Sequence, residues 1–292
     1  MPGIGSWEWV GHDFVSELRD QYCVSVWRDL PPQCDIVIAI KYGFDQRLIG
    51  AVGDAQLVYC PIDAFGSGAD IDRAGVLLCR CARIIVHARP LLKYFRSYAP
   101  VEYLDHALRY VSPLADAHRR SGPILWAGLQ SNLPPLVSWV NENRIPGELR
   151  VLTDCDDDRP SPGQWGFSAD NITVESWTRE RHIECAGRSR AALDIKGDDF
   201  RQRHKPPAKA LDFIASGLPL AMNSDSASSR HLAELGFDVA SPSDTSRWLS
   251  AEYWHETQEL ARHLRQSHTL ERVGQHLCDI VESVLRERGM SQ

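Results

Sequence analysis

The chain has 292 residues and a net charge of −7 at pH 7, with an isoelectric point near 5.9. This length suits two domains that each bury a full hydrophobic core. The 32 basic residues are dispersed along the chain and outnumbered by 39 acidic ones. The composition therefore argues against a nucleic-acid-binding protein, which needs a large cationic surface.

Two classes of segment are missing from the sequence pattern. No stretch reaches the roughly 18 apolar residues of a membrane span. The N-terminal sequence MPGIGSWEWVGHDF has neither the basic nor the apolar region of a signal peptide. We therefore expect a cytoplasmic protein.

The eight cysteines are scattered, with no C-x-x-C pair, and are expected to be buried and reduced. Cys79 and Cys81, together with nearby His87, are residue types that could bind a metal ion. Their one-residue spacing lacks the usual zinc geometry, so no metal site is predicted.

In the first half of the chain, short apolar strands alternate with helical patterns, which predicts parallel βαβ construction. A helix is expected over 12–21. The candidate strands cover 23–27, 35–40, 56–62, 82–88 and 101–105. A small, polar and charged stretch over 115–122 is typical of a linker, so the first domain is predicted to span 1–115.

The second half repeats this construction. The candidate strands cover 123–128, 148–154, 171–177, 191–196, 218–223 and 237–241. They predict a second doubly wound α/β domain over 121–250. Two long helical patterns, 253–265 and 270–286, then make up a C-terminal segment over 251–292.

The segment KPPAKALDFIASGLP, which begins at Lys205, combines a helix start and a helix stop. Pro206 and Pro207 suit a first helical turn, and Gly217 suits the left-handed position after the last turn. The helical period places Lys209 and Asp212 on the polar face. The positive end of the helix and its lysines would hold a diphosphate, and Asp212 would accept hydrogen bonds from ribose. The alternative is an amphipathic helix with a solvated Lys/Asp pair.

This window resembles the donor-binding helix of group 1 glycosyltransferases of the GT-B fold, whose pattern runs roughly K-x-x-E-[YFA]-[ML]-A-x-G-x-P-[VI]. The matching positions are Lys209, Asp212, Phe213, Ile214, Ala215, Gly217, Pro219 and Leu220. The resemblance covers about two-thirds of the chain and is strongest in the second half. It implies two Rossmann-like domains, with C-terminal helices that cross back to the first, and transfer of a hexosyl group from a nucleotide-diphospho-sugar to an acceptor hydroxyl. It implies neither a metal nor a cofactor.

The same resemblance suggests further donor-binding residues. Gly128 follows a strand at the place where the family sets a glycine near the donor phosphates, although a tight turn explains it equally well. Ser131 lies in the following loop, where the family often has a basic residue. Trp177 matches the position against which the nucleobase packs, the alternative being an aromatic core residue.

Because that loop lacks a basic residue, the positive charge that neutralises the donor phosphates is expected from the segment DIKGDDFRQRHKPPAK. Arg203, Lys205 and Lys209 are the donor-binding candidates there, and a solvated charge run is the alternative. His204 stands where the family usually has a first acidic residue, eight positions before Asp212. Gly3 and Gly5 are interpreted either as the remains of a glycine-rich loop or as part of a disordered N-terminal segment.

Asp63 is the catalytic candidate, because it opens a flexible loop directly after a predicted strand of the first domain. Its carboxylate would act as general base on an acceptor hydroxyl if the reaction inverts configuration. A turn or helix-cap role is the alternative.

Two rival functions remain alongside the glycosyltransferase. One is a catalytically silent GT-B protein that binds a nucleotide-sugar, and the other is a sugar-nucleotide epimerase. The acceptor is unspecified and includes glycans, lipid-linked sugars and small molecules. A lipid-linked acceptor would bring the protein loosely to the inner face of the membrane.

Overall fold

The computed structural model describes residues 7–28, 31–41, 44–157 and 160–289. Gly3 and Gly5 lie outside these residues. The chain forms two compact units. The first comprises the chain up to residue 107, residues 199–206 and the chain from 268 onward, and the second comprises 108–198 and 207–267. The two C-terminal helices predicted together over 251–292 thus divide between the units.

The first unit contains a sheet of parallel strands in the order β1-β2-β3-β4, within the described residues. The strands are β1 (Ile36–Ile40), β2 (Gln56–Cys60), β3 (Arg83–Val86) and β4 (Val101–Tyr103). Its helices are η1 (Trp7–His12), α1 (Asp13–Leu18), α2 (Gln46–Val52), α3 (Gly68–Arg73), α4 (Gly75–Leu78), η2 (Arg89–Leu91), α5 (Leu92–Phe95), α8 (Phe200–Arg203) and α13 (Leu270–Glu287).

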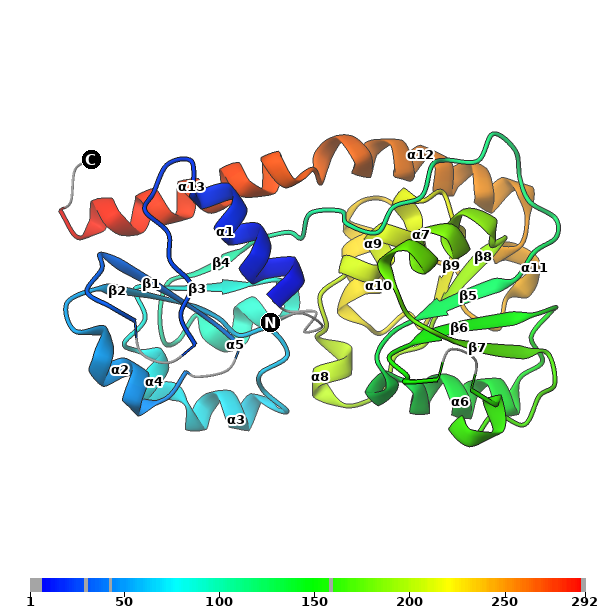
Figure 1. Cartoon of the computed structure of the whole chain (residues 1–292), viewed down its shortest axis with the longest axis horizontal. Coiled ribbons are helices and arrows are strands. Elements are labelled where there is room, and N and C mark those ends of the chain that lie inside the picture. The colour runs from blue at the N-terminus through cyan, green and yellow to red at the C-terminus, as the bar shows by residue number, and fades with distance from the viewer. Residues whose placement is uncertain (1–6, 29–30, 42–43, 158–159, 290–292) are drawn as a thin grey trace. The chain divides into compact units, whose positions relative to one another are not determined.

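This strand order explains why a helix from the far end of the chain belongs to the first unit. Because each strand lies beside its predecessor in one direction, right-handed crossovers place the connecting helices on a single face of the sheet. The opposite face is covered by α1 and α13, which contact one another (Figure 1). Val58, Cys60 and Ile85 point into this second layer and pack in one cluster with Leu277 and Val281 of α13.

The strand predicted over 23–27 does not form. The segment is irregular, and Val26 and Trp27 are 49% and 57% exposed. Its residues have high strand propensity, but such residues form a strand only where a neighbouring strand and a buried face are available. The helix predicted over 12–21 is shorter, at Asp13–Leu18, and is preceded by the π-helical turn η1.

The second unit is doubly wound. Its strands are β5 (Ile124–Ala127), β6 (Leu149–Thr153), β7 (Ile172–Ser176), β8 (Ala191–Asp194) and β9 (Leu220–Met222). They are parallel and ordered β7-β6-β5-β8-β9. Its helices are η3 (Gln130–Asn132), α6 (Leu133–Glu142), η4 (Pro162–Trp165), α7 (Arg179–Arg188), α9 (Ala208–Ala215), α10 (Ala227–Glu234), α11 (Thr245–Trp248) and α12 (Ala251–Ser267). The winding direction reverses between β5 and β8, and ligands bind at such a switch point.

The strand predicted over 237–241 is reduced to one bridge, between Ala221 and Ala240. The hydroxyl of a tyrosine replaces the further backbone hydrogen bonds that a full strand would make with β9. The hydroxyl of Tyr253 donates to the carbonyl oxygen of Leu220 at 2.8 Å and accepts from the amide of Ala240 at 3.0 Å. This pairing depends on α12, which the local sequence around residue 240 does not reveal.

No helix in the described part of the chain combines the length and the apolarity needed to cross a membrane.

Candidate functional site

The switch point of the second unit carries a buried cluster of three charges. Asp194 is the last residue of β8 and is 1% exposed. One carboxylate oxygen lies 2.6 Å from Nζ of Lys209, and the other lies 2.9 Å from Nζ of Lys196. Burial opposes ionisation of this carboxyl, but the two lysines outweigh it and hold the pKa of Asp194 well below its usual range.

Lys209 joins this cluster to strand β5. Its Nζ also donates to the carbonyl oxygen of Ala127 at 2.8 Å, and it lies 4.9 Å from the centre of the Trp126 ring. Lys209 is thus fixed beside the loop that begins with Gly128. One carboxylate and two ammonium groups leave the cluster with a net charge of +1, at the carboxyl ends of β5 and β8.

Gly128 is required by packing against its own strand. A Cβ atom at this position would approach the indole of Trp126 to 2.7 Å, closer than a side chain tolerates. Its amide donates to the carbonyl oxygen of Leu152 at 3.0 Å. Ser131, three residues on, is exposed on η3.

Helix α9 begins at Ala208, directly after the two prolines predicted in its first turn, and ends before Gly217, which has the predicted left-handed backbone with a φ of +68°. Its polar face is not open. Asp212 is 1% exposed, and its carboxylate accepts the backbone amides of Arg109 at 2.9 Å and Tyr110 at 3.2 Å. Ser216, on the same face, is 5% exposed. The alternative of a solvated Lys/Asp pair is therefore wrong for Asp212, because the backbone of residues 109–112 lies over this face. The side chain of Lys209 is 21% exposed.

Trp177 is part of an aromatic cluster rather than an isolated stacking surface. Its ring meets that of Tyr110 edge-on at 5.3 Å, and its indole N–H donates to Nδ1 of His182 at 3.1 Å. The His182 ring stacks on Phe213 of α9, 5.6 Å between centroids. This chain of contacts connects the residue after β7 to the lysine-bearing helix.

The hydrogen bond from Trp177 also sets the protonation of His182. Because Nδ1 accepts, the proton of the neutral ring is on Nε2. Burial, together with the charge of Lys209, lowers the pKa of His182 to about 4. His182 is therefore neutral at physiological pH, and the positive charge of this region belongs to the lysines.

Arg203 and Lys205 belong to the other unit. They lie in residues 199–206, which pack with the first unit, whereas Lys209 lies in the second. Both side chains are partly exposed.

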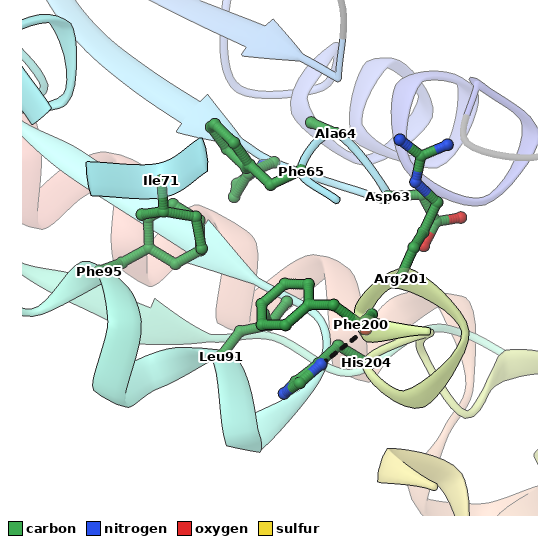
Figure 2. A pocket seen from close by; sticks show the side chains of 10 residues that line it. Asp63, Ala64, Phe65, Ile71, Leu91, Phe95, Phe200, Arg201 and His204 are labelled. Atoms are coloured by element: carbon green, nitrogen blue, oxygen red, sulfur yellow. Dashed lines mark hydrogen bonds between the residues drawn. The ribbon is translucent and has the colours of Figure 1, made fainter. Parts of the chain in front are cut away.

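Asp63 lies after β2, with a φ of +49°, a left-handed conformation that is uncommon for residues other than glycine. It lines a small hollow within the first unit (Figure 2). The residues that line the hollow are Pro61, Asp63, Ala64, Phe65, Ile71, Leu91, Phe95, Phe200, Arg201 and His204. His87 is separate from this lining. Its Nδ1 donates to the carbonyl oxygen of Leu104 at 2.8 Å, and burial lowers its pKa to about 4.

Sequence reasoning missed Asp194 and His182. The signal for Asp194 was present, because a carboxylate at the end of an otherwise apolar buried strand requires a cationic partner. No comparable signal marked His182, whose role depends on its contacts with Trp177 and with Phe213 of α9.

No protein-family model and no curated protein matches this sequence. Solved structures do match it. AviGT4, a glycosyltransferase involved in avilamycin A biosynthesis, is 11% identical and aligns over 98% of this chain and 91% of its own, with a TM-score of 0.60. Anabaena HepE in complex with UDP-glucose is 10% identical over 85% of this chain and 79% of its own, with a TM-score of 0.58.

The GtfA/B complex is also similar, at 12% identity over 85% of this chain and a TM-score of 0.52. This chain spans 57% of the matching chain in that complex. It spans 53% of the matching chain in the Streptococcus pneumoniae complex of accessory secretory proteins 1, 2 and 3, and 54% of the matching chain in the Streptococcus agalactiae Gap123 complex. At such low identities the likeness shows the fold. The two Rossmann-like units are those of the GT-B fold, as the sequence resemblance implied.

Proposed function

We propose that this protein is a GT-B glycosyltransferase whose second unit binds a nucleotide-diphospho-sugar. The observation that carries the proposal is the cluster of Asp194, Lys196 and Lys209. It places a net positive charge, buried and rigidly paired, at the switch point where a doubly wound sheet binds ligands. An anion is the ligand that such a site favours.

The fold supports the choice of anion. HepE, which shares the GT-B fold, was solved with UDP-glucose. In our proposal, Lys209 and Lys196 face the diphosphate, and the first turn of α9 adds its positive end. These groups supply the charge that stabilises the departing diphosphate, so the proposed reaction uses neither a divalent metal nor a cofactor.

Trp177 and His182 have a revised place in this proposal. The indole N–H of Trp177 is already committed to His182, and its ring is already packed against Tyr110. We assign Trp177 to orienting His182 and Tyr110 in the aromatic cluster, rather than to stacking on a nucleobase. Asp212 holds the backbone of residues 109 and 110, and a ribose contact would be additional to that role.

Lys209→Met tests the proposal. UDP, GDP and ADP, with their glucose conjugates, would be titrated calorimetrically against the whole chain. We expect one nucleotide to bind, and the substitution to weaken its affinity by about tenfold or more, as for loss of a hydrogen bond to a charged group. Lys196→Met repeats the test with the second lysine. Lys93→Met is the control, because Lys93 is exposed and belongs to the first unit.

Circular dichroism would verify that each variant is folded. Unchanged affinity in folded Lys209→Met and Lys196→Met would refute the donor site.

A catalytically silent nucleotide-sugar-binding protein is the second candidate. It is favoured because matching structures include accessory-protein complexes and because Asp212 is committed to the backbone. Incubation with the bound nucleotide-sugar separates the possibilities. Slow release of free nucleotide supports a transferase, interconversion of the sugar supports an epimerase, and thermal stabilisation without turnover supports the silent protein.

A further inference from the structure

A long connection without regular structure precedes β5 in the second unit. Residues 108–123 belong to this unit and form neither helix nor strand. Connections of this length without secondary structure are uncommon in compact domains, and many of them have a function. Residues 109–112 within it are called the strap. Tyr110 and Ser112 of the strap are 7% and 1% exposed, so their contacts show what the strap covers.

The backbone of the strap binds the carboxylate that the family resemblance assigns to ribose. The amides of Arg109 and Tyr110 donate to the two oxygens of Asp212, at 2.9 Å and 3.2 Å. Two neighbouring ribose hydroxyls would offer this carboxylate the same kind of contact, a pair of hydrogen-bond donors. Asp212 is 1% exposed while the strap is in place. The two amides therefore stand where the ribose hydroxyls would bind.

The side chain of the strap covers the residue that the resemblance assigns to the nucleobase. The ring of Tyr110 meets that of Trp177 edge-on at 5.3 Å and lies 5.4 Å from that of His182, between centroids. Ring contacts at these distances are stabilising. Trp177 orients Tyr110 in this state, and its ring meets a base only after Tyr110 withdraws. One dipeptide thus occupies both parts of a nucleoside site.

The far end of the strap is anchored apart from these contacts. The amide of Ser112 donates to Oγ of Ser216 on the turn after α9, at 3.1 Å. Arg265 of α12 donates through Nη2 to the carbonyl oxygen of Ser112, and through Nε to that of Ala215 at 2.7 Å. The strap is therefore held by one set of contacts at the nucleoside position and by a second set beyond it.

We propose that the strap is an autoinhibitory segment that occupies the nucleoside half of the donor site. The inference rests on the proposed function and adds its regulation: a nucleotide-sugar binds fully when the strap leaves Asp212 and Trp177. The apparent affinity for a nucleotide is then reduced by the fraction of molecules in which the strap is open. Inorganic pyrophosphate has neither ribose nor base, so it competes with neither contact of the strap.

Amide hydrogen exchange in the unmodified chain tests the strap without any substitution. The probes are UDP, GDP and ADP, and inorganic pyrophosphate. When a nucleoside diphosphate saturates the protein, exchange at the amides of Arg109 and Tyr110 should become faster by about tenfold or more, because both amides lose Asp212 as acceptor. Pyrophosphate should leave their exchange unchanged. Slower or unchanged exchange with a bound nucleotide overturns the proposal, since the nucleotide would then bind with the strap in place.

Two substitutions loosen the strap at different points. Tyr110→Leu removes the ring that faces Trp177 and keeps an apolar side chain. Ser216→Ala removes the acceptor of the Ser112 amide, which lies outside the nucleoside contacts. Each variant should bind the nucleoside diphosphate about fivefold more tightly, or better, while its affinity for pyrophosphate stays unchanged.

Tyr98→Leu and Ser246→Ala are the matched controls, because Tyr98 belongs to the first unit and Ser246 is exposed on α11. Circular dichroism would verify that each variant is folded. Equal gains for nucleotide and pyrophosphate, or no gain in nucleotide affinity, overturn the strap and leave the donor site intact. A nucleotide that binds only the loosened variants supports both proposals. If neither a nucleotide nor pyrophosphate binds any folded variant, the donor proposal fails and the strap proposal fails with it.

Discussion

Replacing Asp194 with asparagine is expected to move stability and anion binding in opposite directions. The carboxylate is 1% exposed and lies 2.6 Å and 2.9 Å from two lysine Nζ atoms. Asparagine keeps the shape but leaves the two ammonium groups without their counter-charge. Removal of one partner from a buried ion pair costs about 3–5 kcal/mol. We therefore expect Asp194→Asn to lower the free energy of unfolding by about that amount.

The same change raises the charge of the cluster from +1 to +2. A unit charge about 5 Å from a phosphate, at an effective dielectric constant of about 20, contributes about 3 kcal/mol. Solvent screening reduces this figure, and a gain of about tenfold in affinity is a reasonable expectation. UDP or inorganic pyrophosphate should therefore bind the folded variant more tightly than the wild type, and should raise its melting temperature by a larger increment.

The assay combines urea unfolding with calorimetric titration at low ionic strength. Asp170→Asn is the matched control, because Asp170 is an exposed carboxylate of the same unit. A folded Asp194→Asn protein with weaker anion binding than the wild type would refute the reasoning, because it would mean that the carboxylate itself serves the ligand. Unchanged stability would refute the buried ion cluster.

Two further substitutions test the surroundings of the site. Asp212→Asn should lower the free energy of unfolding by about 1–3 kcal/mol, because the amides of Arg109 and Tyr110 lose a charged acceptor. Urea unfolding measures this change. Unchanged stability would mean that Asp212 does not stabilise the fold and serves only to bind a ligand. His87 and His182 have pKa values of about 4 in the folded protein, against about 6.5 when unfolded. Their contribution to stability is thus complete above about pH 6.5 and is lost as the pH falls toward 4, by up to about 2 kcal/mol per histidine at pH 5. His87→Leu and His182→Leu should each show a smaller loss of stability between pH 7 and pH 5 than the wild type; equal losses in all three proteins would contradict the burial of neutral imidazoles.

Local patterns in the sequence determined the class of the fold. Nine of the candidate strands form, since short apolar runs separated by helical patterns have few ways to bury themselves other than parallel βαβ units. The approximate extent of α9 was equally readable, because two prolines at its start and Gly217 after its end restrict the backbone locally, although the helix begins at Ala208, after the prolines. The segments over 23–27 and 237–241 have similar propensities yet form no ladder, since a strand needs a partner that local sequence does not specify.

Tertiary structure decided the surroundings of each site residue. A helical period places Lys209 and Asp212 on one face, but it does not say what covers that face. The backbone of residues 109 and 110 buries Asp212, while Asp194 and Ala127 hold Lys209 in place. Likewise, nothing near residue 200 indicates that its segment packs with Tyr94 and the loop of Asp63. Periodicity describes a single element, whereas burial and charge pairing depend on which distant elements meet.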